Sequence, residues 1–142
     1  MLIRNARVVT AGEGPLRGDA LGRLRAHDAC DVLLVGDRLQ SLGVGLEAPV
    51  GASVLEADGR VLAPGFVDCH THACWAGDRL DEWDLKRAGA GYLELLNAGG
   101  GIMSTVRAVR GASEDLLADT LLDRLNRALA HGTTTVEVKS GY

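Results

Sequence analysis

Up to about residue 63, the chain shows short apolar runs separated by turn-forming residues. Each run is bounded by Gly, Pro or Asp, a pattern that predicts short strands joined by hairpins. The predicted strands cover residues 2–9, 31–35, 38–42, 53–56 and 60–63. Gly36-Asp37 predicts a hairpin turn between two of them. Residues 12–22, which include Pro15, predict an exposed loop.

After Pro64 the predicted elements are longer. Residues 65–70 predict a buried strand entered through Pro-Gly, and the β-branched residues 133–138 predict a second one. The longest predicted helix starts at a Ser113 cap, carries an apolar stripe at spacings of three and four, and stops before Gly132. The helices predicted between the two strands cover residues 92–97, 102–110 and 113–131. The order strand, helices, strand predicts one βαβ unit of a parallel sheet, hence an α/β fold.

The number of predicted elements is small for a complete α/β protein. A βαβ unit cannot cover both faces of its own sheet, and a (β/α)₈ barrel needs about 250 residues. The chain has 142 residues, and its last predicted strand ends four residues before its end. We therefore expect two parts, residues 1–63 and 64–142, which form the N-terminal portion of a longer protein.

Composition narrows the class of protein. Apolar residues make up 46% and charged residues 24% of the chain, which excludes disorder for most of it. Basic residues are neither clustered nor in excess at a net charge of −4, so we expect no nucleic-acid partner. No apolar run reaches the roughly 18 residues of a membrane helix, and Arg4 and Arg7 interrupt any signal-peptide core. Three cysteines without a signal peptide indicate free thiols in a reducing cytoplasm.

Two histidines carry the clearest chemical signal. His70 and His72 follow the strand predicted after Pro64, and residues two apart in a strand face the same side. Two neutral imidazoles are good ligands for zinc or ferrous iron. Asp68 has the same parity and is a candidate acceptor that orients a ligand histidine. A bare His-x-His is as often an ordinary strand end, but the acid and both histidines in register favour a metal site.

Other candidates have a structural interpretation that we prefer. Cys74 shares the parity of the histidines, but a buried free thiol is favoured over a thiolate ligand. The glycines at 99–101 lack the lysine-serine pair of a phosphate-binding loop, which favours a sharp turn or a close approach to a ligand. Glu137 and Lys139 flank Val138 on one side of a strand, where an ion pair is the commoner role.

The segment between the histidines and the first predicted helix is aromatic and acidic. Trp75 and Trp83 are expected to pack a loop over the site, or else to line a substrate pocket. The carboxylates of Asp81, Glu82 and Asp84 are expected to form a solvated face of this loop.

Residues 65–72, Gly-Phe-Val-Asp-Cys-His-Thr-His, resemble the first-strand motif of the amidohydrolase superfamily. That resemblance implies a (β/α)₈ TIM barrel, preceded by the N-terminal share of a small β-sandwich in residues 1–63. A narrower resemblance, to the imidazolonepropionase family, covers residues 64–142 closely and residues 1–63 only in pattern. It is carried by Ala-Gly-Asp-Arg at 76–79, Asn-Ala-Gly-Gly-Gly-Ile at 97–102, Ser-Thr-Val-Arg at 104–107 and the whole segment 131–142.

The narrower resemblance implies hydrolysis of 4-imidazolone-5-propanoate to N-formimidoyl-L-glutamate, with one zinc or iron ion as cofactor. It implies His70 and His72 as two metal ligands. It further implies Arg79, Tyr92 and Tyr142 as residues that bind this small-molecule substrate. The chemistry is suitable: a guanidinium binds a propionate through paired hydrogen bonds, and a metal activates the water that attacks a cyclic amide. A homodimer is also implied for the intact protein.

The same family usually adds a third histidine, an aspartate and a proton-transferring histidine from later strands. His27, expected in a polar loop, and His131, at a helix end, are not placed to supply them. We therefore expect the general base beyond residue 142 and no turnover by residues 1–142 alone. The alternatives are another amidohydrolase, such as a nucleobase deaminase or a cyclic-imide hydrolase, and a non-catalytic barrel assembly protein.

Overall fold

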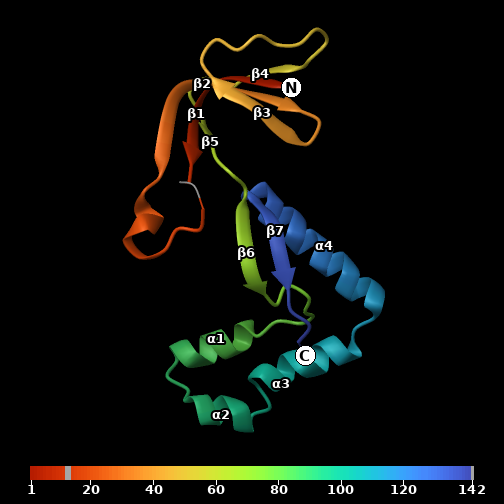
Figure 1. Ribbon diagram of the computed structural model, residues 1–142. Helices are drawn as coiled ribbons and strands as arrows, with labels where there is room; N and C mark the ends of the chain where they lie inside the picture. The colour runs from red at the N-terminus through yellow and green to blue at the C-terminus, as the bar shows by residue number, and fades with distance from the viewer. Residues whose placement is uncertain (12–13, 142) are drawn as a thin grey trace. The chain divides into compact units, whose positions relative to one another are not determined.

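The computed structural model describes residues 1–11 and 14–141, which form two compact units, Met1–Pro64 and Gly65–Tyr142. The first unit is a five-stranded sheet with the order β3-β2-β1-β4, in which β5 also pairs with β1 (Figure 1). Its elements are β1 (Leu2–Thr10), a 3₁₀ turn η1 (Gly18–Gly22), β2 (Arg25–Val35), β3 (Arg38–Gly43), β4 (Val54–Glu56) and β5 (Val61–Leu62).

The pairing of the first unit corrects the expectation of hairpins throughout. β2 and β3 form the expected antiparallel hairpin around Gly36, but β4 and β5 pair in parallel with β1. The long central strand β1 holds both short strands on one edge. The backbone N–H of Leu2 donates to Ser53 at 2.8 Å, and that of Arg7 donates to Arg60 at 2.9 Å. The connection after β3 therefore brings β4 and β5 back to β1, and local turn residues do not predict this pairing.

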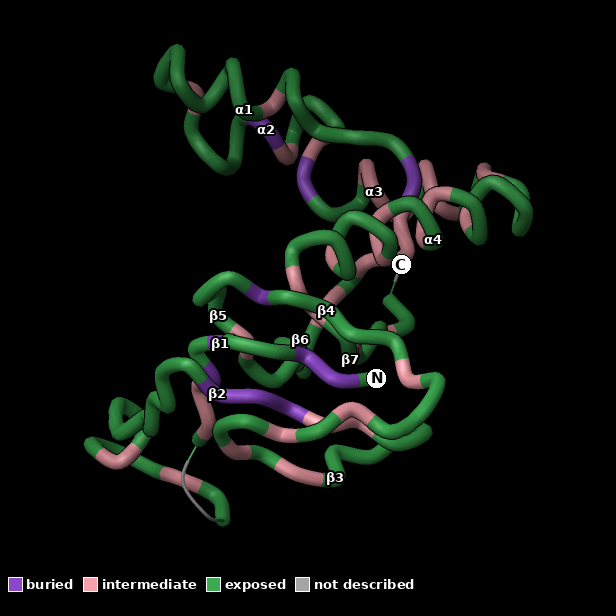
Figure 2. The backbone as a smooth tube through the Cα atoms, turned by 90° about the horizontal axis from the view of Figure 1, so that it is seen from above, coloured by how far each residue is buried: buried purple, intermediate pink, exposed green. Residues whose placement is uncertain are grey.

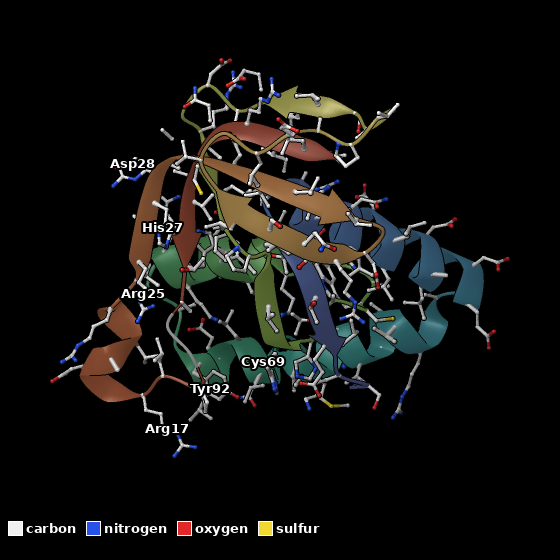
Figure 3. The ribbon with its side chains drawn as sticks, turned by 45° about the horizontal axis from the view of Figure 1, so that its top comes forward. Arg17, Arg25, His27, Asp28, Cys69 and Tyr92 are labelled. Carbon is white, nitrogen blue, oxygen red and sulfur yellow. The ribbon has the colours of Figure 1, made fainter. Side chains whose placement is uncertain are left out.

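The strand β2 begins six residues earlier than predicted and corrects the position of His27. His27 lies in this strand opposite Val8, not in a polar loop. Figure 3 shows it between Arg25 and Asp28 along the same strand. The sequence did not predict this part of β2, because its residues are polar and show no apolar alternation. Backbone pairing to β1 holds the segment, together with an exposed ion pair of 3.3 Å between Arg7 Nε and Asp28 Oδ1.

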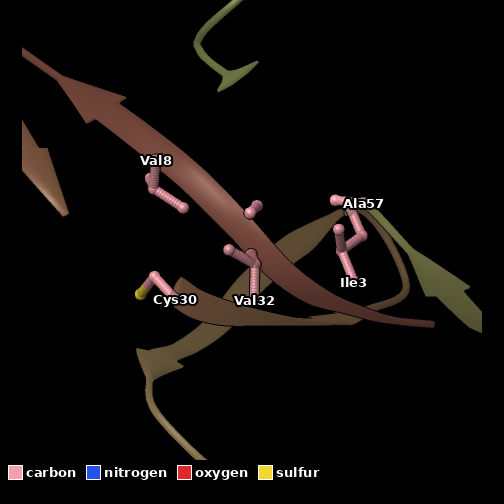
Figure 4. Packing of buried hydrophobic residues seen from close by; sticks show 6 residues of the cluster. Ile3, Val8, Cys30, Val32 and Ala57 are labelled. Carbon is pink, nitrogen blue, oxygen red and sulfur yellow. The ribbon is translucent and has the colours of Figure 1, made fainter. Parts of the chain in front are cut away.

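The core of the first unit lies on β1 and β2 (Figure 2). The alternating inward residues of the two strands pack together, with Ala57 beyond β4 and with the partly buried Leu34 and Leu62. Figure 4 shows this cluster, which comprises Ile3, Ala6, Val8, Cys30, Val32 and Ala57. Small and β-branched side chains fill it, as the scarcity of aromatic residues requires.

The second unit is a parallel strand pair with four helices between the strands. Its elements are β6 (Phe66–Thr71), α1 (Leu80–Arg87), α2 (Tyr92–Asn97), α3 (Ile102–Gly111), α4 (Glu114–Ala130) and β7 (Thr133–Val138). β6 and β7 pair in parallel, which confirms the predicted order of strand, helices and strand. Within residues 1–11 and 14–141, no helix is long and apolar enough to cross a membrane.

Two features of this unit differ from the predictions. The helix α1 was not predicted, because its sequence LDEWDLKR carries no apolar stripe and it buries no residue. The strands β6 and β7 are mostly exposed, although both were predicted as buried; Phe66 is 65% and Val67 66% accessible. Parallel sheets are normally covered on both faces, but a strand pair with one helix packed against it leaves a face uncovered. The apolar side chains of β6 and β7 are therefore largely exposed.

Candidate active site

The histidine pair lies where β6 ends. His70 is the second-to-last residue of β6, and His72 follows the strand. Their ring centroids are 5.4 Å apart at an interplanar angle of 67°. The predicted common facing of the two imidazoles is therefore observed. Both residues are exposed.

The backbone on either side of the pair is held by hydrogen bonds. Asp68 Oδ1 accepts the backbone N–H of His70 at 3.3 Å, so in this structure the carboxylate supports the main chain of His70. Thr71 Oγ1 donates to the carbonyl of Glu137 at 2.8 Å, and the Lys139 N–H donates to the carbonyl of Thr71 at 2.8 Å. The neighbouring strand β7 thus fixes the residue that separates the two histidines.

A pocket of about 450 Å³ joins one histidine to the predicted substrate-binding arginine. It is lined by His72, Trp75, Asp78, Arg79, Leu80, Trp83 and Thr105. Of the two roles left open for the tryptophans, lining a pocket is the one that this geometry supports. The site therefore combines an imidazole, a guanidinium and two flat indole walls within one cavity.

Arg79 is the residue that immediately precedes α1. The start of this helix is fixed by Asp78 Oδ1, which accepts the Leu80 N–H at 3.1 Å. Among the described residues, the Arg79 guanidinium forms no ion pair with a carboxylate. Its charge is consequently available to an anionic ligand.

Tyr92, predicted to bind the substrate, does not line the pocket that holds His72 and Arg79. It begins α2, is 68% accessible and lines a smaller pocket of about 140 Å³, into which Arg79 also faces. Figure 3 shows its side chain at the helix end. Arg79 is thus the residue that the two pockets share.

Tyr142 lies outside the described residues, so its predicted role in binding the substrate remains a prediction. The residue before it does lie beside the histidine pair. A Cβ placed on Gly141 would be 2.9 Å from His72 Nδ1, so the backbone after β7 passes directly against that ring.

The glycines at 99–101 form the predicted sharp turn. Gly99 and Gly101 have φ angles of 85° and 72°, which favour glycine, and the Gly101 N–H donates to Glu82 Oε1 at 2.8 Å. Glu82 is half-buried, and this contact corrects its assignment to a solvated face. Its carboxylate ties α1 to the turn between α2 and α3.

The remaining candidates have structural roles. Glu137 and Lys139 form the ion pair that was favoured, with Oε1 and Nζ 2.5 Å apart. Cys74 is a free thiol, as expected, but it is half-buried and lines another pocket, with Lys139. Cys69, on β6, is exposed and also free (Figure 3).

Sequence reasoning missed Arg124 on α4, which contacts the loop that carries Trp75. Its Nη1 donates to the carbonyls of Ala73 and Trp75, both at 2.8 Å, and its guanidinium carbon lies 3.8 Å from the centroid of the Trp75 ring. No signal in the sequence could have found it, because about 50 residues separate the partners and the arginine lies within an ordinary amphipathic helix.

The donor set fits part of a metal site. Metal–nitrogen bonds of about 2 Å from each imidazole would reach across the separation of the two rings. In the described part of the chain, however, no group of three or more His, Cys, Asp or Glu side chains is placed to hold an ion. Two protein ligands are fewer than the three that catalytic zinc sites use.

Several curated proteins are similar to almost the whole of this chain. The imidazolonepropionase of Herpetosiphon aurantiacus is 49% identical over 144 residues, covering 99% of this chain and 34% of the relative. The imidazolonepropionases of Rubrobacter xylanophilus and Deinococcus radiodurans are 48% and 44% identical; each match covers 96% of this chain and 34% of the relative. No family model matches the chain.

The parallel pair of β6 and β7, with helices between its strands, defines the class of the chain as a mixed α/β protein. Within that class, it belongs to the imidazolonepropionase family. The chain spans about a third of the length of the curated relatives that it matches.

Proposed function

We propose that the protein containing this chain hydrolyses 4-imidazolone-5-propanoate to N-formimidoyl-L-glutamate in histidine breakdown. One water molecule is consumed and one ring C–N bond of the cyclic amide is broken. The observation that carries the proposal is the pocket that His72, Arg79 and two tryptophans line together. Such a pocket suits a flat heterocycle with an anionic tail.

Each part of this substrate has a matching group in the pocket. The indole faces of Trp75 and Trp83 offer stacking surfaces for the ring. The Arg79 guanidinium binds the propionate by two parallel hydrogen bonds, which an ammonium group cannot reproduce. Tyr92 lines the second pocket together with Arg79, and the chain leading to Tyr142 passes His72.

His70 and His72 would hold one divalent ion, zinc or iron, since imidazole suits both. When bound, the ion supplies an activated water and polarises the amide carbonyl. Asp68 and Thr71 keep the backbone of the pair in place through their hydrogen bonds. The remaining ligands and the general base would come from outside residues 1–142, within a (β/α)₈ barrel that β6 and β7 begin. We further propose that residues 1–63 contribute to a β-sandwich and that the intact protein is a cytoplasmic homodimer.

The role of Arg79 can be tested in the full-length protein. Truncation of the guanidinium in Arg79→Ala removes charged hydrogen bonds worth about 1.5–3 kcal/mol, so KM should rise roughly 10- to 100-fold. Steady-state kinetics with the propionate substrate measures the change. Arg87→Ala, at the exposed far end of the same helix α1, is the matched control and should leave KM unchanged.

A substrate analogue without the propionate separates this proposal from the deaminase alternative. We expect the wild-type enzyme to discriminate against the truncated substrate, and Arg79→Ala to lose that discrimination. An unchanged KM in Arg79→Ala, or equal turnover of a neutral nucleobase by the wild type, would contradict the assigned substrate.

A further inference from the structure

The loop that follows the histidine pair is held by a side chain from a distant helix. Residues 72–76 lie outside every helix and strand, so no backbone ladder fixes them. Arg124, on α4, supplies the missing contacts: one nitrogen, Nη1, donates to two carbonyls of this loop, those of Ala73 and Trp75, each at 2.8 Å. The helix is thereby fastened to the segment that carries one wall of the pocket.

The same guanidinium also fixes the Trp75 side chain. Its central carbon lies 3.8 Å from the ring centroid, within the range of a cation–π contact. The carbonyl contacts restrict the backbone of Trp75 and the stacked guanidinium restricts its ring. Trp75 lines the pocket with His72 and Arg79, whereas Arg124 does not line it.

We infer that Arg124 is a positioning residue, which presents the Trp75 indole as a rigid wall for the heterocyclic part of the substrate. This inference rests on the proposed function. A wall held in place before binding costs no ordering entropy when the ligand arrives, so its effect falls on substrate affinity. Because Arg124 acts through Trp75, its contribution should vanish once the indole is removed.

The helix provides a matched control for charge and length. Arg127 lies three residues further along α4, is 75% accessible and forms an ion pair with Asp123 at 2.6 Å. Arg127→Gln therefore removes the same charge from the same helix without touching the loop. Any change that is common to Arg124→Gln and Arg127→Gln reports on α4 rather than on the pocket.

The kinetic test is a double-mutant cycle of Arg124→Gln and Trp75→Leu in the full-length protein. We expect Arg124→Gln to raise KM about tenfold, as for coupled neighbours in contact, with kcat within about twofold of wild type. In the Trp75→Leu background, the same change should leave KM unaltered. A KM that stays at the wild-type value, or two changes that simply add, would overturn the inference.

A second measurement does not depend on turnover. In protein labelled with 5-fluorotryptophan, Trp75→Phe identifies the Trp75 fluorine resonance. Arg124→Gln should shift and broaden that resonance and leave Trp83 in place, while Arg127→Gln should leave both unchanged. If the spectra behave so but the wild type does not hydrolyse the propionate substrate, the proposed function fails and the positioning of Trp75 stands. If the enzyme turns over normally and the Trp75 resonance does not respond, the positioning inference fails alone.

Discussion

At the scale of single residues, Asp31 shows how one carboxylate organises the first unit. It is buried in β2, where Oδ1 accepts the Asn5 N–H and Oδ2 accepts the Leu46 N–H, both at 3.0 Å. These hydrogen bonds, first that from Asn5 and then that from Leu46, hold the pKa of Asp31 below its ordinary value of 3.8. Asn5 has a φ of 53°, so the carboxylate also secures an irregular point in β1.

The lowered pKa makes a prediction about acid stability. The folded protein binds the Asp31 proton less readily than the unfolded chain does. The stabilisation is therefore complete above the ordinary pKa near 3.8 and is lost as the pH falls through the lower folded value. Asp31→Asn should be less stable than wild type at neutral pH, with a difference that shrinks below pH 3.8.

Urea unfolding at a series of pH values checks this expectation. Asp37→Asn is the control, because Asp37 lies in the exposed hairpin turn and forms an exposed ion pair with its neighbour Arg38. That variant should follow the wild-type curve at every pH. A constant gap between Asp31→Asn and wild type down to the acid limit would show that the carboxylate charge does not contribute.

At the scale of elements, α4 connects the local sequence to the site, because it carries Arg124. Ser113 caps the helix, and its Oγ accepts the Leu116 N–H at 3.2 Å, as the sequence predicted. Ser113→Ala should lower the free energy of unfolding by about 1 kcal/mol, since one N–H of the first turn loses its acceptor. Ser113→Asp keeps an acceptor and should remain close to wild type in the same urea titration. Equal losses in both variants would mean that the cap hydrogen bond is not the source.

The elements also show what the sequence could and could not predict. Helix α4 was foreseen because a cap, an apolar stripe and a glycine stop agree with one another. Helix α1 was not predicted, because it buries no side chain and its sequence therefore needs no apolar stripe. The parallel pairing of β4 and β5 with β1 also escaped prediction, since register between distant segments leaves no local pattern.

The candidate site divides in the same way. The facing of His70 and His72 follows from strand parity, so the sequence was sufficient for it. The clamp of Arg124 on Trp75 joins segments about 50 residues apart and could come only from the structure. The contact between Glu82 and the turn at Gly101 is of the same tertiary kind.

At the scale of the whole molecule, one proposal accounts both for the exposed strands and for a site with two histidines. Phe66 and Val67 are apolar but two-thirds accessible, and parallel sheets are covered on both faces in complete proteins. Further strands beside β6 and β7 would bury these residues. The carboxyl ends of such strands would lie at the same edge as His70 and His72, which is where the proposed metal site would take its further ligands.

The metal content of the full-length protein tests this synthesis. We expect close to one zinc or iron ion per chain in the wild type, measured by elemental analysis after gel filtration. His70→Ala and His72→Ala should each lose most of it, because removal of one imidazole leaves the ion with an incomplete donor set. His131→Ala is the control, since His131 is the C-cap residue of α4 and is distant in sequence from the histidine pair. Full metal content in both pair variants would remove these histidines from the site, whereas loss in all three would trace the effect to folding. Loss confined to the pair would establish that the end of β6 holds the ion and that the rest of its ligands come from elsewhere in the protein.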